Sequence, residues 1–389
     1  MTAKPLAGIR VLELARILAG PWAGQLLADL GAEVIKVERP DDGDDTRHWG
    51  PPFLTDRQGN SLDAAYFHAC NRGKRSIAID IASPQGQAEV RALAATSDVV
   101  IENFKVGALA KYGLDHAGLS AVNPRIVTCS ITGFGQTGPY APRAGYDFII
   151  QAIGGAMSLT GEPDGAPQKA GIAYADIFTG MYATVAILAA LRRRDETGIG
   201  AHIDMALLDS QVGVLANQAL NYMATGEVPK RMGNGHANLV PYQGFACADG
   251  DIIVAVGNDR QFVKLCAILG LDALPTDERF RTNPSRVTNR DMLLPLLAAA
   301  IAIWPRATLA ARMEAAGVPG GPINPLDAVF ADPQVIARGM AIVSPGPDGP
   351  LPGLASPIVI DGERQNAHRA APRLDADGAT IREELEEGR

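Results

Sequence analysis

The stretch "GIRVLELARILAGPWAGQLLADLGAEVIKVE", residues 8–38, decides the fold. It begins and ends with short apolar runs, "GIRVLEL" and "AEVIKVE", which are typical of buried strands. Between them Pro21 can open a helix, since proline is well tolerated in a first helical turn. A strand, a helix and a second strand of this length predict a parallel pair joined by a right-handed crossover.

The same alternation continues along the next hundred residues. Strand-like runs lie at 75–81, 98–104 and 125–131, and Ser83-Pro84 begins a helix that extends to about Thr96. Alternating strands and helices predict an α/β domain with a parallel, nucleotide-binding-like sheet.

A second region of different character follows residue 225. It contains a Gly/Asn/Pro loop, a short strand "GDIIVAVG" and helices separated by prolines, so we expect a smaller α+β domain. Residues 345–357 are predicted to be a turn-rich connector, and the acidic tail "REELEEGR" a surface helix or frayed end. A chain of 389 residues is long enough for two domains.

Composition excludes several classes of protein. A net charge of −8 argues against general nucleic-acid binding, and 47% hydrophobic residues can build a substantial core. The four cysteines form no C-x-x-C pair, which indicates reduced thiols in a cytoplasmic protein. The six histidines show no ligand spacing, so we predict no metal. The apolar run 181–191 is too short to span a bilayer, and we expect no membrane association.

The segment "GFGQTG", residues 133–138, matches the G-x-G-x-x-G fingerprint of dinucleotide-binding proteins. That fingerprint requires the glycine turn to open a helix whose N-terminus holds the pyrophosphate. Here Pro139 and Pro142 follow at once, which predicts a loop instead. A glycine loop whose backbone lies close to a bound ligand remains the alternative.

Basic residues gather near the ends of the predicted strands. Arg39 follows the second strand, "NRGKR" (71–75) precedes the third, and Lys105 and Lys111 follow "ENF". Ligands of open parallel sheets bind beyond the carboxyl ends of the strands, where cations suit phosphates. The grouping favours an anionic, nucleotide-like ligand, and a solvated surface is the alternative for any one side chain.

A single acid precedes a long apolar run in "AYADIFTGMYATVAILAALRRRDETGIG", residues 173–200. Asp176 is followed by eighteen residues without a carboxylate. The plain interpretation is an N-cap, since an aspartate oxygen accepts the free N–H groups of a first helical turn. The alternative is a functional acid that an apolar helix holds in dry surroundings.

Taken in order, these segments resemble the class III CoA-transferases, the CaiB/BaiF family. The resemblance covers nearly the whole chain and is carried by residues 8–40, "GDDTRHWGPPF", "NRGKRSIAIDI", "VIENF", "SITGFGQTGPYAPRAGYDFIIQAIGGAMSLTG" and the stretch after Asp176. "VPYQGF", "NPSRVTNRDML" and "GVPGGPINPLDAVFADPQV" are similar to succinyl-CoA:glutarate and related dicarboxylate CoA-transferases.

The resemblance implies an architecture. A large α/β CoA-binding domain would comprise residues 1–205 and a C-terminal segment, 335–389, that returns to it, with a small domain at 225–325. Two chains would thread through each other as an interlocked homodimer. One departure is "APRLDADGAT" near the C-terminus, where the family commonly has a Gly-Glu-His segment.

The resemblance also implies a site. Asp176 matches the nucleophilic aspartate, and a glycine-rich loop that closes over it matches Gly233, Asn234, Gly235 and His236. Positions that match CoA contacts are Ile17, Leu18, Arg39, Ile79, Asn103, Phe104 and Lys111. CoA and acyl-CoA would be substrates, with no permanently bound cofactor.

The implied reaction moves CoA from an acyl-CoA, such as succinyl-CoA, to a free carboxylate, such as glutarate. Asp176 would attack the thioester to give an aspartyl anhydride and then an aspartyl-CoA thioester. An ordinary aspartate is ionised at neutral pH, so we expect no general base. Arg47 is our first candidate for the far carboxylate of a diacid, followed by Tyr146 and His236.

Three alternatives remain. An acyl-CoA racemase on the same fold would need an acid–base pair, but no histidine lies between 117 and 201. A nicotinamide oxidoreductase would use "GFGQTG" and respond to NAD. A non-catalytic CoA-binding protein would have no activity to lose when Asp176 is replaced.

Overall fold

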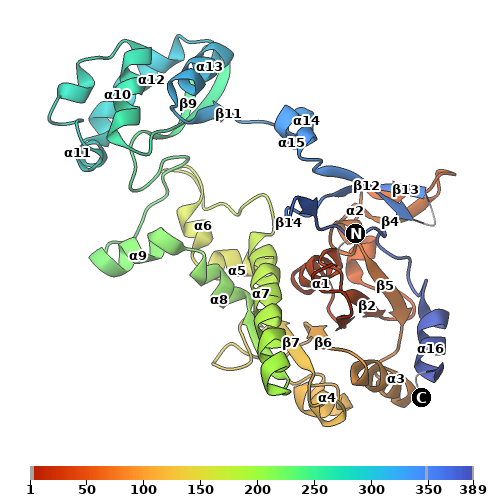
Figure 1. The fold of residues 1–389 in the computed structure, drawn as a ribbon. Coiled ribbons are helices and arrows are strands. Elements are labelled where there is room, and N and C mark those ends of the chain that lie inside the picture. Colours follow the sequence, from red (N-terminus) through yellow and green to blue (C-terminus); the bar gives the residue numbers. More distant parts are fainter. Residues whose placement is uncertain (1–3, 347–348, 388–389) are drawn as a thin grey trace. The chain divides into compact units, whose positions relative to one another are not determined.

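The computed structural model describes residues 4–346 and 349–387, which form two compact units (Figure 1). The first unit extends to Gly155, resumes over Ala170–Ala216 and includes the chain from Pro333 onward, and the second comprises Ala156–Lys169 and Asn217–Asp332. The sequence had placed 156–169 in the large domain. The segment joins the second unit because Gly233 N–H donates to the Gly161 carbonyl, and Arg231 donates to the Glu162 carbonyl.

A six-stranded parallel sheet organises the first unit. Its order is β5 (Lys74–Ala78), β2 (Glu33–Glu38), β1 (Arg10–Glu13), β6 (Val99–Glu102), β7 (Val127–Thr132) and β8 (Ala201–Ala206). This confirms the predicted α/β class and all five predicted strands. The sixth strand, β8, was not predicted, because it lies at the edge and its half-exposed residues alternate with polar ones.

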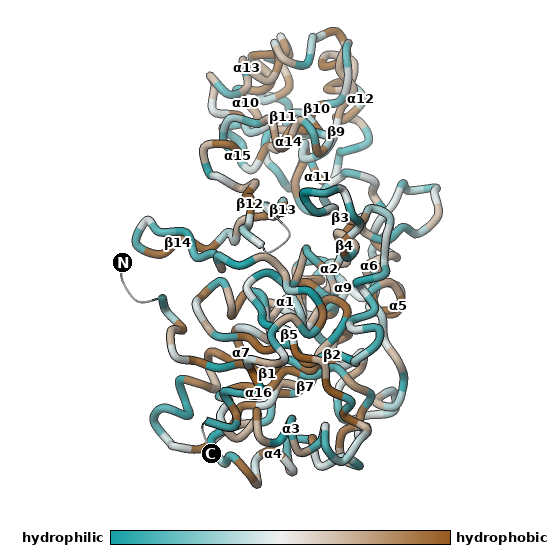
Figure 2. The backbone as a smooth tube through the Cα atoms, turned by 90° about the vertical axis from the view of Figure 1, so that its right-hand side faces the viewer, coloured by the Kyte–Doolittle hydropathy of each residue, from teal (hydrophilic) through white to brown (hydrophobic). Residues whose placement is uncertain are grey.

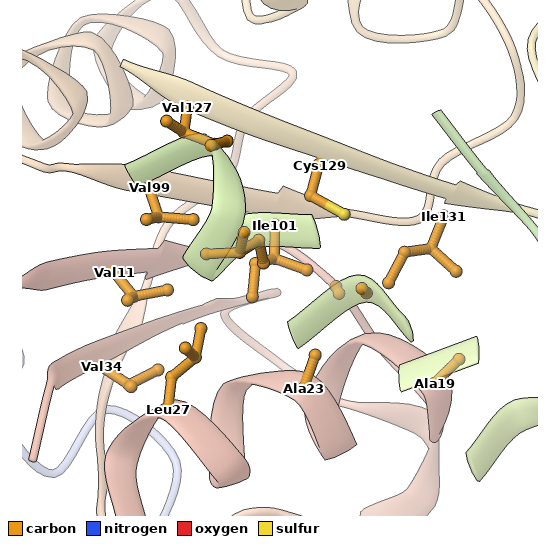
Figure 3. Close-up of a cluster of buried hydrophobic side chains, with 14 of the residues drawn as sticks. Val11, Ala19, Ala23, Leu27, Val34, Val99, Ile101, Val127, Cys129 and Ile131 are labelled. Carbon is orange, nitrogen blue, oxygen red and sulfur yellow. The ribbon is translucent and has the colours of Figure 1, made fainter. Parts of the chain in front are cut away.

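Helices cover both faces of this sheet. One face packs α1 (Ala19–Asp29) and α7 (Tyr174–Thr197) against a buried cluster that includes Val11, Val99 and Ile101 (Figure 3). The other face carries α3 (Pro84–Ala95), α4 (His116–Val122) and α16 (Gly378–Glu387) over Val100 and its neighbours. Burial on both faces explains the continuous apolar runs of the inner strands, which Figure 2 colours as hydrophobic.

Helices α1 and α7 approach closely at Gly180. A Cβ there would lie 2.6 Å from the Ala19 carbonyl oxygen and 3.1 Å from Trp22 Cβ. Only glycine permits this approach without a shift of backbone. The contact brings the first turns of both helices to the same end of the sheet.

The second unit is built on a three-stranded antiparallel sheet in the order β11 (Gly320–Pro322), β10 (Gly250–Ala255), β9 (Tyr242–Cys247). Its core, which includes Phe262, Leu293, Leu297 and Met313, is shared with α10 (Asp259–Leu269), α12 (Arg290–Ala302) and α13 (Arg306–Ala316). β10 confirms the predicted strand "GDIIVAVG".

The C-terminal part of the first unit differs from the predicted connector. Within the described residues, the range 345–357 contains the end of β12 (Ala341–Gly346) and all of β13 (Gly349–Leu354), which pair antiparallel, and residues 347–348 lie outside the described residues. The divergent "APRLDADGAT" segment docks on the edge strand β5, where Asp377 and Asp375 accept the N–H groups of Ser76 and Ala78. Residues 382–387 of the acidic tail form the end of α16, the helix alternative of the prediction, and residues 388–389 lie outside the described residues.

Short elements complete the chain. They are η1 (Asp45–His48), β3 (Phe53–Thr55), β4 (Ser61–Ala64), α2 (Ala65–Cys70), η2 (Ala110–Tyr112), α5 (Asp147–Ile153), α6 (Ala156–Leu159), α8 (Leu207–Gly213), α9 (Ala216–Thr225), η3 (Leu274–Thr276), α11 (Asn283–Thr288), α14 (Leu326–Ala331), α15 (Pro333–Ala337), β14 (Val359–Ile360) and β15 (Glu363–Arg364).

Among residues 4–346 and 349–387, α7 is the one helix long and apolar enough by itself to cross a membrane, and the pair α12 and α13 passes the same test only together, with a bend of 115°. Helix α7 is longer than the apolar run 181–191 suggested. Its Ala183 and Ile187 lie in the core of the first unit, as in the core helix of a folded domain, so length and composition are weak support for a span.

Candidate active site

The order of the central sheet places a crevice between β1 and β6. From β1 the chain proceeds through β2 to β5 on one side, and from β6 through β7 to β8 on the other. Ligands of open α/β sheets bind at such a switch point, beyond the carboxyl ends of the strands. The Asn103 side chain joins the two loops here, accepting the Arg16 N–H at 2.9 Å and donating to the Arg16 carbonyl at 2.7 Å.

A cavity of about 350 Å³ opens at this switch point and contains Asp176. The structure brings together five further residues predicted for the site, all of which line this cavity: Ile17, Leu18, Asn103, Phe104 and Tyr146. They come from the loop after β1, the loop after β6 and the N-terminus of α5, so residues far apart in sequence meet around one carboxylate.

A second cavity of about 350 Å³ shares Arg16, Phe104 and Ala108 with the first. It is lined by the other predicted CoA contacts, Arg39, Ile79 and Lys111, and again by Phe104. Arg39 forms an exposed ion pair with Asp45 at 3.2 Å, and the Lys111 ammonium lies 4.5 Å from the centre of the Tyr112 ring. The second cavity therefore presents Arg39 and Lys111 next to the Asp176 cavity, and the carboxylates Glu38, Asp44 and Asp80 also line it.

Asp176 does not cap its own helix. It is the third residue of α7, and the cap comes from Asp147 at the start of α5. One Asp147 oxygen accepts the N–H groups of Ala175 and Asp176 at 2.9 and 3.4 Å, and the other accepts the Gln151 side-chain amide at 2.6 Å. Because another residue performs the capping, the Asp176 carboxylate is available for chemistry.

The surroundings of Asp176 disfavour its charge. Burial, and next the charge of Asp147, raise its pKa to about 7. This corrects the expectation of an ordinary aspartate that is fully ionised at neutral pH. Burial, and next the charge of Asp176, also raise the pKa of the Tyr66 hydroxyl, so that phenol stays protonated.

Arg47 does not serve the cavity, which corrects its prediction as the partner of a substrate carboxylate. Its side chain is 2% exposed, donates to Glu38 from Nε at 2.8 Å and Nη2 at 2.6 Å, and reaches Asp63 from Nη1 at 2.5 Å. Its guanidinium also stacks 3.7 Å from the centre of the Phe67 ring. These partners lie on β2, β4 and α2, where sequence spacing gave no sign of them.

Arg143 is a cation that sequence reasoning missed. It lines the Asp176 cavity, and its guanidinium lies 3.8 Å from the centre of the Tyr140 ring. It forms no ion pair with any residue in the described part of the chain. Its position within "GPYAPRAGYD" was the available signal, since this loop joins β7 to the capping Asp147.

The predicted lid residues, Gly233 to His236, belong to the second unit. Gly233 has a left-handed φ of 55°. The His236 N–H donates to the Tyr242 carbonyl at 3.0 Å, and its Nδ1 accepts the Asn238 N–H at 3.0 Å. The loop is therefore folded upon itself, with one imidazole nitrogen used for its internal structure.

The "GFGQTG" segment is a loop, as predicted, because the next helix begins only at Asp147. Gly133 and Gly145 both line the Asp176 cavity, and a Cβ at Gly133 would lie 2.5 Å from Gly145 Cα. These glycines serve close backbone packing rather than a helix start. Among the residues that the structure describes, no cluster of His, Cys, Asp or Glu could hold a metal ion.

Comparison with known proteins gives consistent results. A family model described as CoA-transferase family III matches residues 6–378. The chain is 54% identical over 383 residues to a succinate–glutarate CoA-transferase of Agrobacterium fabrum, covering 98% of this chain and 96% of that protein. It is 46% identical over 339 residues to a succinyl-CoA:glutarate CoA-transferase of Mus musculus, covering 87% and 76%. A crystal structure of a CaiB/BaiF family protein from Brucella suis has a TM-score of 0.87 at 57% identity, covering 99% and 100%.

Proposed function

Because the chain belongs to CoA-transferase family III and is a CoA-transferase, we propose that it moves CoA from succinyl-CoA to a short dicarboxylate such as glutarate. The single observation that carries the mechanism is Asp176, a carboxylate of raised pKa in a cavity next to a hollow that Arg39 and Lys111 line. The names of the two relatives support the choice of substrates.

We propose that CoA spans both cavities. Its anionic nucleotide end would lie in the hollow lined by Arg39 and Lys111, where cations suit phosphates. Its pantetheine arm would pass Phe104, which lines both cavities, so that the thioester reaches Asp176. This direction of binding is supported because Arg39 and Lys111 line only the second cavity, Asp176 lines only the first, and Phe104 lines both.

The chemistry follows from one carboxylate. Asp176 attacks the succinyl thioester carbonyl, and CoA leaves as the thiolate, giving a mixed succinyl–aspartyl anhydride. The thiolate then attacks the aspartyl carbonyl, which releases succinate and leaves an aspartyl-CoA thioester. The acceptor carboxylate displaces CoA to form a new mixed anhydride. The thiolate attacks the acceptor's acyl carbonyl, which releases its CoA thioester and restores Asp176.

Negative charge develops on oxygen in each of these steps and needs hydrogen-bond donors. The first turn of α7 has none to spare: Ala175 and Asp176 donate to Asp147, Tyr174 to the Ile172 carbonyl, and Ile177 to the Ala173 carbonyl. The donors must therefore come from other groups that line the Asp176 cavity, and the Arg143 guanidinium is one such group.

The far carboxylate of the acceptor needs a cation, and Arg143 replaces Arg47 as our candidate. Its guanidinium is stacked on one face by Tyr140, and its edge can form two parallel bonds to a carboxylate. Replacing Arg143 with Gln should raise the KM for glutarate about tenfold and leave a monocarboxylate acceptor unchanged. A rise in the KM for succinyl-CoA instead would assign Arg143 to CoA.

We further propose that the chain acts as a homodimer. Four large side chains of α7 are between 38% and 62% exposed, although the helix is mostly apolar: Phe178, Met181, Tyr182 and Val185. An apolar helix face of this kind is stable in water when another surface covers it. Light scattering tests the proposal, and a monomer at working concentrations would contradict it.

The experiment for the proposed function is an acceptor screen with succinyl-CoA as donor. Formation of a new CoA thioester is measured with glutarate, other diacids and monocarboxylates, alongside exchange of the donor α-proton with deuterium. Glutaryl-CoA formation without deuterium exchange supports the proposal. Deuterium exchange without transfer would favour the racemase alternative on this fold.

A further inference from the structure

The turn between β1 and α1 has an unusual backbone. Ile17 has a φ of +73°, although it is a β-branched residue for which the left-handed region is a true outlier. It lies directly on the Asp176 cavity. Strained backbone of this kind persists only where the surrounding structure holds it in place.

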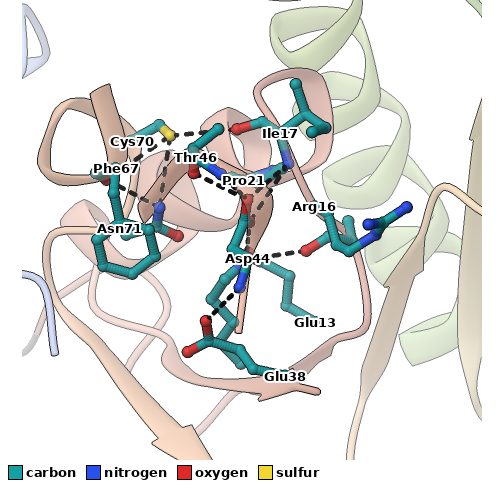
Figure 4. A network of polar contacts seen from close by, with 12 residues as sticks. Glu13, Arg16, Ile17, Pro21, Glu38, Asp44, Thr46, Phe67, Cys70 and Asn71 are labelled. Carbon is teal, nitrogen blue, oxygen red and sulfur yellow. Dashed lines mark hydrogen bonds and ion pairs between the residues drawn. The ribbon is translucent and has the colours of Figure 1, made fainter. Parts of the chain in front are cut away.

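Asp44 holds this turn. Its two carboxylate oxygens each lie 3.3 Å from the Ile17 amide nitrogen, which donates to them (Figure 4). The Cys70 thiol donates to the Ile17 carbonyl with its sulfur 3.6 Å from the oxygen. The peptide on each side of Ile17 is therefore bound by a side chain from a distant segment.

Asp44 is itself fixed from several sides. It is fully buried, pairs with the Lys36 ammonium at 2.9 Å, and accepts the N–H and hydroxyl of Thr46 at 3.0 and 2.8 Å. Its own N–H donates to Glu38 at 3.0 Å. Lys36 in turn donates to Glu13 at 3.0 Å and to the Ala15 carbonyl at 2.8 Å. The Asp44 carboxylate is therefore fixed by its other partners and cannot move with the turn if Ile17 relaxes.

We propose that Asp44 is a positioning residue for acyl-CoA, because it holds Ile17 in the left-handed conformation that shapes part of the wall of the Asp176 cavity. The inference rests on the proposed function of that cavity. Asp44 lines the second cavity but not the Asp176 cavity, on which it acts through Ile17. If the Ile17 N–H loses its acceptor at Asp44, Ile17 should relax to negative φ. The wall of the Asp176 cavity should then move, while α7 keeps Asp176 in place.

The test compares one substitution in two proteins, the parent and Ile17→Gly. Asp44→Ala removes both oxygens that accept the Ile17 N–H, and glycine at position 17 adopts positive φ without strain and needs no such acceptor. In the parent, Asp44→Ala should raise the KM for succinyl-CoA about tenfold while kcat changes less than about twofold. In the Ile17→Gly protein, Asp44→Ala should raise KM by less than about twofold.

A matched control is Thr46→Val, which removes a hydrogen bond to Asp44 but leaves the bond to Ile17. It should leave KM unchanged. An equal rise in KM in both backgrounds would overturn the proposal, since Asp44 would then act through general stability. A parent protein without transferase activity would instead refute the proposed function and is recognised before any variant is compared.

A second comparison covers the case in which Asp44→Ala does not fold. Ile17→Ala and Ile17→Gly both remove the side chain, but only glycine relieves the backbone. The glycine variant should melt a few degrees higher than the alanine variant. Equal melting temperatures would mean that Ile17 stores no strain for Asp44 to hold, which contradicts the proposal.

Discussion

Two groups of buried carboxylates lie near the candidate active site, and their surroundings are opposite. In the first group Glu13 and Asp44 have the ammonium groups of Lys36 and Lys74 as partners, at distances of 2.8 to 3.0 Å. In the second, Asp176 forms no ion pair within the described part of the chain and faces the like charge of Asp147. The same chemical group is ion-paired in one place and, in our proposal, is the nucleophile in the other.

The pKa values follow this difference. Burial opposes the charge of Asp44, but Lys36 and the hydrogen bonds of Thr46 outweigh it and lower its pKa to about 2. Burial is not compensated at Asp176, and its pKa rises to about 7. Both carboxylates are buried, so the neighbouring charges and hydrogen-bond donors, rather than the depth of burial, decide which of them stays ionised.

The largest effect should come from removing the reactive carboxylate. Asp176→Asn preserves shape but loses the nucleophile, so kcat should fall by at least about 10⁴-fold. Steady-state transfer from succinyl-CoA measures this, with Thr46→Val as a folded control. Retention of more than a few per cent of parent kcat would remove Asp176 from the mechanism.

The next effect concerns the paired group. Lys36→Met leaves buried Glu13 and Asp44 without one shared cation, and breaking such a pair should cost about 3–5 kcal/mol of unfolding free energy. Urea denaturation at pH 7 measures this loss. A change below about 1 kcal/mol would mean that the ion pairs do not hold the region together.

Asp176→Asn should have the opposite effect on stability. A carboxyl whose folded pKa is raised favours the protonated form, so its cost is absent below about pH 4 and grows until pH passes about 7. Asn removes this cost, and the variant should be more stable than the parent by roughly 1–3 kcal/mol at pH 8 and by little at pH 4. Thermal melting across this pH range tests the sign.

The smallest effect is a shift in a pH profile. The reaction needs ionised Asp176, so kcat/KM should rise with pH and level off above about 7. Asp147→Asn keeps an oxygen for the helix cap and removes the neighbouring charge, so the apparent pKa should move down. A profile that does not move would mean that burial alone sets the pKa of Asp176.

The parts of the molecule that the sequence predicts are those that depend on local sequence patterns. The apolar runs at 8–14 and 32–38 gave β1 and β2, and the family resemblance, now confirmed, selected Asp176 from an ambiguous helix start. The parts that were missed depend on contacts between distant segments. Nothing near Asp147 shows that it accepts the N–H of Ala175, 28 residues later, in the first turn of α7. Nothing near Arg47 shows that Glu38 and Asp63 surround it.

The most direct measurement of the central claim is intact-mass spectrometry of the protein after brief incubation with succinyl-CoA, followed by trapping with hydroxylamine and peptide mapping. The account predicts a CoA or succinyl adduct on the parent, a hydroxamate mapped to Asp176, and no adduct on Asp176→Asn. Active parent protein with no adduct, or an adduct that persists on Asp176→Asn, would contradict it.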